Sequence, residues 1–322
     1  MDIVMEEKQS EEVRDFLAKL DLETDPGVEF TLSLRENGKV CACGSLDGNV
    51  IKGIGVDPTM QGQGLSEQLM TYLRREAFSR GHRHLFVYTK PINEILFRGL
   101  GFFPIAATGK ALLLESTRGG LRKYLESMEK HPGKNGAVVM NCSPFTLGHR
   151  YLIEQAREKC DWLYVFVLAE EKGMFRASDR LEMVKRGCAD LDNVSVSSTE
   201  GYLISNATFP TYFLKDKAQG NKISCQMDIE IFSGQFAPAL GITKRFVGTE
   251  PLDPVTCAYN QALQEQLPRR GIEVCEVVRR ELDAAPISAS RVRKAIEAGQ
   301  WETVQQLTPQ TTYEYLKTMI GG

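Results

Sequence analysis

Two short segments in the second half of the chain carry side chains suited to phosphate. Residues 140–149 (MNCSPFTLGH) follow an apolar run and lead into a helical pattern, so they join the end of a strand to the start of a helix. Residues 287–293 (ISASRVR) open another helical pattern and pair hydroxyl N-cap residues with arginines. Free backbone N–H groups and the positive end of the helix dipole bind anions at such starts. The sequence therefore predicts two phosphate-binding helix starts, and His149 adds a side-chain donor to the first.

A third candidate site is the glycine-rich segment 58–66 (PTMQGQGLS) in the first half of the chain. It lies between an apolar strand pattern and an amphipathic helical pattern. Backbone N–H groups exposed by such a loop can hold the pyrophosphate of coenzyme A. The alternative is a plain structural turn.

The pattern around this segment predicts an α+β domain over residues 1–115, with antiparallel strands joined by tight turns such as Asn37-Gly38. The expected elements are a helix capped by Ser10, strands at 28–34, 40–46, 50–56 and 84–88, and a helix at 65–77. Residues 116–135 predict a helix and a turn that link this domain to the next.

From residue 136 onward, strand and helix patterns alternate, which is typical of a parallel sheet. The alternating segments are 136–141, 148–160, 161–170, 178–190, 194–198, 206–218, 228–232 (DIEIF), 242–250, 253–267 and 271–279, with a helical tail from Ser288. We therefore expect a second, α/β domain over residues 136–322.

The composition excludes several classes of function. With 39 Lys+Arg against 42 Asp+Glu, the net charge of -3 gives no reason to expect nucleic acid or an anionic membrane as partner. No apolar run approaches the roughly 20 residues of a spanning helix, and the acidic amino terminus does not have the form of a signal peptide. The eight Cys include no CxxC pair and the four His no HExxH pattern, so we expect reduced thiols, no metal site and a cytoplasmic protein.

The two phosphate-type segments also carry a family resemblance. NCSPFTLGH resembles the T/HxGH signature, and ISASRVR the ISSTxxR signature, of the nucleotidyltransferase superfamily. Essentially the whole chain is similar to the citrate lyase ligase family, in MNCSPFTLGHRYLIEQA, YLISNATFPTYFLK, RFVGTEPLDPVTCAYNQAL and ISASRVR. The resemblance implies an α+β acetyltransferase-like domain followed by an α/β Rossmann-like nucleotidyltransferase domain.

The resemblance further implies the residues of a nucleotide site. His149 would stabilise the α-phosphoryl oxygens of ATP, Thr146 would assist it, and Arg293 would hold the departing β,γ-phosphates. The other nucleotide-binding or phosphate-binding residues would be Asn141, Ser143, Phe145, Gly148, Lys172, Arg180, Gly248, Thr249, Glu250, Ile287, Ser288, Ser290 and Arg291. Alternatives stay open at two positions, since Lys172 could be a solvated loop residue and Arg180 could pair with a neighbouring carboxylate, Asp179 or Glu182.

The glycine-rich segment resembles the Q/RxxGxG/A loop of GCN5-type acetyltransferases. This resemblance implies that a pantetheine or CoA-like group is bound by Gln61, Gly62, Gln63, Gly64, Leu65 and Ser66. Phe97 stands where that fold often has a Tyr that protonates the leaving thiolate, and Ser66 replaces a small apolar residue or Gly. We therefore expect the first domain to bind such a group without catalysing transfer.

The reaction implied by the family resemblance has two steps. Acetate attacks the α-phosphorus of ATP and releases pyrophosphate, and the acetyl group then passes to the prosthetic-group thiol of the citrate lyase acyl carrier subunit, a group derived from dephospho-coenzyme A. Mg²⁺ would arrive bound to the phosphates of ATP. Two alternatives use the same motifs: a pantetheine-phosphate-type adenylyltransferase, and a regulatory protein that binds acyl-CoA and ATP.

Overall fold

The computed structural model describes residues 2–6, 9–23, 25, 27–171, 173–203, 209–214, 219–250, 253–282 and 285–320. The chain divides into two compact units. The first unit consists of Met1–Tyr124 and Phe209–Glu230, and the second of Leu125–Thr208 and Ile231–Gly322. A segment that follows the first three strands of the second unit in sequence is therefore part of the first unit.

The first unit is built on a seven-stranded sheet in the order β1-β2-β3-β4-β5-β7-β6. Its strands are β1 Asp2–Glu6, β2 Phe30–Glu36, β3 Lys39–Asp47, β4 Val50–Val56, β5 Phe86–Thr89, β6 Phe103–Ala107 and β7 Leu112–Glu115. Its helices include α1 Glu11–Lys19, α2 Leu65–Ser79 and α3 Glu94–Gly99, with 3-10 turns η1 Pro58–Met60 and η2 Pro91–Asn93. Ser10 caps α1 as predicted, because its side chain accepts a hydrogen bond from the backbone of Val13.

One strand pair in this sheet is parallel and opens toward its carboxyl end. β4 and β5 pair only through Val50 with Phe86 and Ile51 with Val87, although both strands continue beyond these residues. The other neighbours in the sheet pair antiparallel. The two parallel strands therefore diverge, and their carboxyl ends are free to border a ligand cavity.

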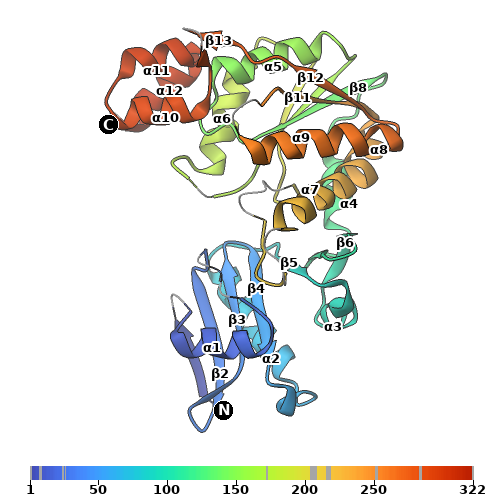
Figure 1. Cartoon of the computed structure of the whole chain (residues 1–322), viewed down its shortest axis with the longest axis vertical. Coiled ribbons are helices and arrows are strands. Elements are labelled where there is room, and N and C mark those ends of the chain that lie inside the picture. Colours follow the sequence, from blue (N-terminus) through green and yellow to red (C-terminus); the bar gives the residue numbers. More distant parts are fainter. Residues whose placement is uncertain are drawn as a thin grey trace. The chain divides into compact units, whose positions relative to one another are not determined.

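The second unit contains a five-stranded parallel sheet in the order β10-β9-β8-β11-β12. Strands β8, β11 and β12 of this sheet are labelled in Figure 1. Its strands are β8 Asn135–Met140, β9 Leu163–Val167, β10 Val194–Ser198, β11 Ile242–Gly248 and β12 Glu273–Val277, and a small hairpin joins β13 Glu281–Leu282 to β14 Ala285–Pro286. Its helices include α5 Leu147–Arg157, α6 Ala177–Gly187, α8 Ala237–Leu240 and α9 Pro254–Gln266, followed by 3-10 turn η5 Pro268–Arg270 and the helices α10 Ala289–Glu297, α11 Trp301–Leu307 and α12 Gln310–Ile320. Helix α4, Gly120–Ser127, lies where the first part of the chain passes into this unit.

Each unit has its own apolar core. Leu32, Leu69 and Leu114 are fully buried in the first unit, and Val165, Ile153 and Val292 are fully buried in the second. The predicted fold class, an α+β domain followed by a parallel α/β domain, is confirmed. Among the described residues, no helix combines the length and the apolar character needed to cross a bilayer.

The structure corrects the alternation expected at 228–232 (DIEIF). These residues lie in helix α7, Gly220–Ile231, and in the π-helical turn η4, Phe232–Phe236. The apolar residues Ile229, Ile231 and Phe232 are buried together with Asp228, so this short alternation of acidic and apolar residues does not by itself exclude a buried helix. Strands β1, β6 and β7 were not predicted, and the expected segment 206–218 lies partly outside the described residues.

Candidate functional site

The second unit has a cavity of about 370 Å³ at the carboxyl ends of β8 and β11. The strand order reverses at this point. Strands β9 and β10 lie on one side of β8, whereas β11 and β12 lie on its other side. Open parallel sheets bind ligands at such a point, and the volume falls within the range of small-molecule sites. The sequence-predicted residues that line the cavity are Asn141, Gly148, His149, Gly248, Glu250, Ile287 and Ser288.

His149 is fixed by the cap of helix α5. The side chain of Thr146, the N-cap residue, accepts a hydrogen bond from the backbone N–H of His149 at 3.3 Å. The backbone N–H of Thr146 in turn donates to Nδ1 of His149 at 3.1 Å. Because a backbone N–H can only donate, Nδ1 carries no proton, and the neutral ring holds its proton on Nε2. This capping box presents His149 to the cavity as a hydrogen-bond donor of fixed orientation.

The charge state of His149 follows from its surroundings. Burial lowers the pKa of the imidazole to about 4, and the positive charge of Arg279 contributes to the same shift. Phe145, which is fully buried, lies nearly parallel to the ring with 5.9 Å between ring centroids. His149 is therefore neutral near pH 7 and can stabilise an anion by a hydrogen bond but not by a full charge.

The two phosphate-type motifs are in direct contact. A Cβ at Gly148 would lie 2.7 Å from the backbone oxygen of Ile287, so the start of α5 approaches the ISASRVR segment as closely as only Gly allows. From the other side, Nη1 of Arg293 donates to the backbone oxygen of Ser143 at 2.6 Å. Gly148 and Ile287, about 140 positions apart in sequence, both line the cavity, so the two motifs meet at one wall of it.

A second wall joins the ends of β11 and β12. Nη2 of Arg279 donates to the carboxylate of Glu250, and the backbone N–H of Arg279 donates to Oγ1 of Thr249 at 3.2 Å. Asn260 donates from its side chain to the backbone oxygen of Gly248 at 2.9 Å and also lines the cavity. These contacts place one ion pair, Arg279 with Glu250, on the cavity lining.

The first unit has its own cavity, of about 810 Å³, between the diverging ends of β4 and β5. Gln61, Gly62, Gly64, Leu65 and Ser66 line it, whereas Gln63 is not part of the lining. Gly64 is the N-cap of α2 with a φ of 76°, and Gly62 has a φ of 79°, so both occupy the left-handed region that Gly adopts without strain. Since Gly64 has no side chain to cap the helix, the first N–H groups of α2 face a potential ligand directly.

The chain is similar to proteins of known function over almost its whole length. Residues 135–316 match the family model of the citrate lyase ligase C-terminal domain, and residues 2–102 match that of the acetyltransferase (GNAT) family. A [citrate [pro-3S]-lyase] ligase of Klebsiella pneumoniae is 41% identical over 98% of this chain and 94% of its own length. The chain belongs to the citrate lyase ligase family. Its relative in Escherichia coli strain K12 is 40% identical over 98% of this chain and 92% of its own length.

A phosphopantetheine adenylyltransferase of Clostridium botulinum strain 657 is also similar, at 35% identity. That match extends over 99 residues, which are 30% of this chain and 56% of the adenylyltransferase. The whole-length likeness to citrate lyase ligases is therefore the more informative of the two.

Several residues that the family resemblance implied lie behind the cavity lining. Arg180 is fully buried, and its Nη1 donates to the backbone oxygen of Asn141 at 2.8 Å and to the side-chain oxygen of Asn141 at 2.6 Å. Its Nη2 donates to the backbone oxygen of Glu170. These contacts replace the pairing with Asp179 or Glu182 that the sequence left open, and they fix the end of β8 that carries Asn141.

The residues of the second motif are likewise divided between the cavity lining and the structure behind it. Ser288 is the N-cap of α10 and lines the cavity, and its hydroxyl lies 3.1 Å from that of the exposed Ser290. Nη1 of Arg291 donates to the backbone oxygens of Ala285 and Pro286, both at 3.1 Å, and so holds the β13–β14 hairpin. Within the first motif, the side chains of Thr146, Phe145 and Ser143 are buried. Lys172 lies outside the described residues.

Two arginines that line the cavity of the second unit, Arg279 and Arg245, were not predicted from the sequence. Arg279 directly follows the apolar run of β12, so its position at a strand end was a signal for the ligand edge. Arg245 is 2% exposed inside β11, with its guanidinium carbon 4.2 Å from the centroid of the Phe232 ring. A charged residue within an apolar strand pattern was the signal in that case.

Proposed function

We propose that this chain uses ATP to activate acetate in the cavity of the second unit and then acetylates the prosthetic-group thiol of the citrate lyase acyl carrier subunit. The proposal places the protein in the cytoplasm, where it converts citrate lyase to its active form. Its main support, beyond family membership, is the neutral and rigidly oriented His149 between the two joined phosphate-type motifs.

In the first step, a carboxylate oxygen of acetate attacks the α-phosphorus of ATP, and the bond to the departing pyrophosphate breaks. Acetate is already an anion, so no protein base is needed, and catalysis rests on position and on stabilisation of charge. The Nε2–H of His149 would donate to an α-phosphoryl oxygen, while Thr146 acts through His149 by holding its ring. Ser288, Ser290 and the half-buried Arg293 would receive the β,γ-phosphates at the start of α10.

The second step transfers acetyl to a thiol. The thiolate sulfur attacks the carbonyl carbon of acetyl-adenylate, the bond to the phosphate oxygen breaks, and AMP leaves. A thiol with a pKa of about 8.5 ionises enough near neutrality to react in an electropositive cavity. Arg279 and Arg245 contribute positive charge to this one.

In this proposal, Mg²⁺ is bound through the phosphates of the nucleotide and not at a site of its own. Glu250 is the one carboxylate of the cavity lining among the described residues, and it is held by Arg279. This donor set does not make a dedicated Mg²⁺ site, and Mg²⁺ normally binds through phosphate oxygens and water in nucleotide enzymes.

In the first unit, we propose that the glycine-rich loop binds part of the carrier's prosthetic group. The uncapped start of α2 suits its phosphate groups, and the 810 Å³ cavity suits the extended arm. Phe97 is buried and lines this cavity, so the position offers no acid to protonate a leaving thiolate. This unit would hold the arm and leave the chemistry to the second unit.

Exchange of labelled pyrophosphate into ATP tests the proposed reaction. We expect exchange that depends on acetate, because the first step is then reversible. Exchange that instead requires 4′-phosphopantetheine would assign the chain to the adenylyltransferases, and no exchange with either compound would favour a regulatory protein. The full chain is needed for this measurement, since Phe209–Glu230 belongs to the first unit and a fragment starting at the second unit would separate it from its packing partners.

A further inference from the structure

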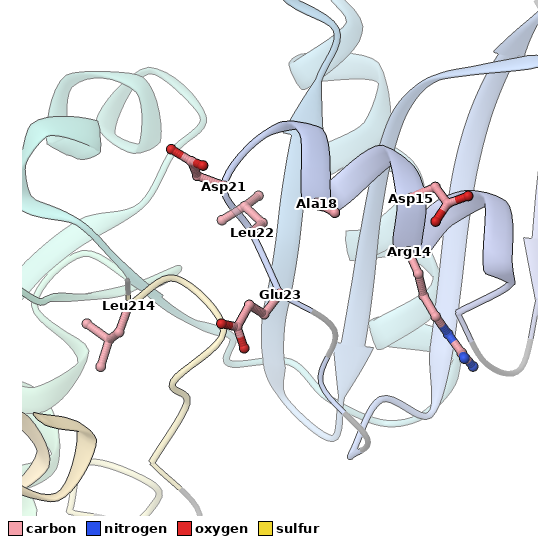
Figure 2. A pocket seen from close by; sticks show the side chains of 7 residues that line it. All are labelled: Arg14, Asp15, Ala18, Asp21, Leu22, Glu23 and Leu214. Atoms are coloured by element: carbon pink, nitrogen blue, oxygen red, sulfur yellow. The ribbon is translucent and has the colours of Figure 1, made fainter. Parts of the chain in front are cut away.

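The cavity of the first unit is completed by a part of the chain that lies far away in sequence. The inserted segment, residues 209–214, follows β10 but belongs to the first unit. The backbone N–H of Glu23 donates to the backbone oxygen of Tyr212 at 2.9 Å. Figure 2 shows Leu214 of this segment beside Leu22 and Glu23, where the three residues border a shallow pocket. The inserted segment is therefore packed along the loop that follows α1.

Tyr212 occupies the place where β4 and β5 cease to pair. Its hydroxyl donates to the backbone oxygen of Tyr88 in β5 at 2.7 Å, and the backbone of Gly53 in β4 is hydrogen-bonded to the same hydroxyl. Both residues lie just beyond the last paired positions, Ile51 and Val87. Backbone groups that diverging strands leave unpaired need other partners when they are buried. The phenol supplies one partner to both strands and stabilises the open arrangement.

The aromatic side chains of the inserted segment form one end of the cavity. Tyr212 and Phe213 are 6% and 1% exposed, and both belong to the cavity lining. The glycine-rich loop lies beyond the carboxyl end of β4, whereas Tyr212 contacts β4 at Gly53, three residues before that end. Ile54, Gly55 and Val56 line the cavity between these two positions. An extended arm with its phosphates on the loop would run along β4 toward the two aromatic rings.

We infer that Tyr212 and Phe213 are the floor of this cavity and determine the size of group that the thiol end of the arm can carry. A free thiol or an acetyl thioester fits against an apolar floor, whereas a long acyl chain would have to displace buried rings that are hydrogen-bonded or packed in place. The inference rests on the proposed binding of a pantetheine arm by the first unit. It adds a specificity-determining role for a segment from the second half of the chain.

Calorimetry with the full-length protein and with CoA, acetyl-CoA and octanoyl-CoA tests this inference. We expect wild type to bind CoA and acetyl-CoA with similar affinity and octanoyl-CoA at least tenfold more weakly. Tyr212→Ala removes the floor and should reduce this discrimination about tenfold or more, equivalent to about 1.4 kcal/mol. Tyr212→Phe keeps the ring, loses the hydroxyl bridge and should retain the selectivity of wild type.

The possible results separate the inference from the proposal on which it rests. If wild type binds none of the three compounds, the proposed role of the first unit is wrong. If wild type binds all three equally, or if Tyr212→Ala and Phe213→Ala both leave the selectivity unchanged, the arm site stands and the floor assignment is wrong. Circular dichroism and thermal unfolding report whether Tyr212→Ala is folded, and Phe213→Ala, which leaves the hydroxyl bridge intact, provides a second opening of the same floor.

Discussion

The two candidate sites begin at helix starts that are built in opposite ways. At α5, the side chain of Thr146 occupies the position of a ligand, because it already accepts the backbone N–H of His149. At α2, the N-cap residue is Gly64, and no side chain stands before the helix. The first arrangement fixes one side-chain donor at the cost of free backbone donors, and the second keeps the backbone donors for a ligand.

This difference separates a site suited to catalysis from a site suited to binding. A donor held in one orientation can strengthen its bond as charge develops in a transition state without reorganising. A row of backbone N–H groups binds a phosphate that has the same charge before and after the reaction. Four predictions test this contrast, in decreasing order of expected effect.

His149→Ala should lower the rate of acetyl-adenylate formation by roughly 10²- to 10³-fold, as is usual for loss of one such donor. Binding of ATP should change little, because the contact is expected to strengthen mainly in the transition state. Single-turnover kinetics and equilibrium binding measure the two effects separately. A variant with normal kcat and a raised KM for ATP would show that the contact belongs to the ground state.

Gly148→Ala should destabilise the second unit by about 1–3 kcal/mol, since the added Cβ would meet the backbone oxygen of Ile287 at 2.7 Å. Gly248→Ala is the matched control on the same cavity, where the nearest atom to an added Cβ is a side-chain carbon of Arg279 at 3.8 Å. Its stability should change by less than about 1 kcal/mol. Thermal unfolding of the two variants side by side checks the difference, and equal losses would contradict it.

Gly64→Asp should weaken binding of dephospho-CoA about tenfold relative to Gly64→Asn. Both side chains tolerate the left-handed backbone better than most, so the pair shares any conformational cost and differs in one negative charge. That charge would stabilise the start of α2 while repelling the anionic ligand. Calorimetry compares the affinities, and identical values for the two variants would show that no anion binds at this helix start.

The pH dependence of stability should report the neutral state of His149 in the folded protein. Its pKa falls from 6.5 to about 4 on folding, so between these values the unfolded chain binds the proton and the folded chain does not. Stability is therefore complete above pH 6.5 and decreases as the pH falls toward 4. For this partly exposed ring the loss should amount to about 1 kcal/mol. His149→Gln lacks this contribution, so its Tm should decrease less than that of wild type between pH 7 and pH 5.

Local patterns in the sequence were sufficient to predict much of the fold. The parallel sheet and the capped first helix follow from periodicity and cap residues, and the family resemblance implied that the two distant motifs serve one nucleotide site. The roles of Arg180 and Arg291 did not follow, because an arginine near a phosphate motif has the same sequence signature whether it binds phosphate or backbone oxygens. Residues 228–232 were misassigned because an alternation of acidic and apolar residues over five positions also fits within a longer buried helix.

The position of the inserted segment could not be predicted from the sequence. The local pattern of residues 206–218 predicts no partner for Tyr212, and its partners Tyr88 and Gly53 are more than 120 residues away. Nothing in local propensity encodes a hydrogen bond across that separation. The same holds for the pKa of His149, which depends on burial and on Arg279 from another strand end.

The inserted segment also sets the order in which the protein can be completed during synthesis. The first unit lacks Tyr212 until roughly 90 residues after Tyr124 have been translated, which takes on the order of ten seconds at about 5–20 residues per second. During this interval β4 and β5 have no phenol between their diverging ends, so the cavity of the first unit is incomplete. The final packing of the amino-terminal half therefore waits for the carboxyl-terminal half, so the two halves mature as one chain and not in succession.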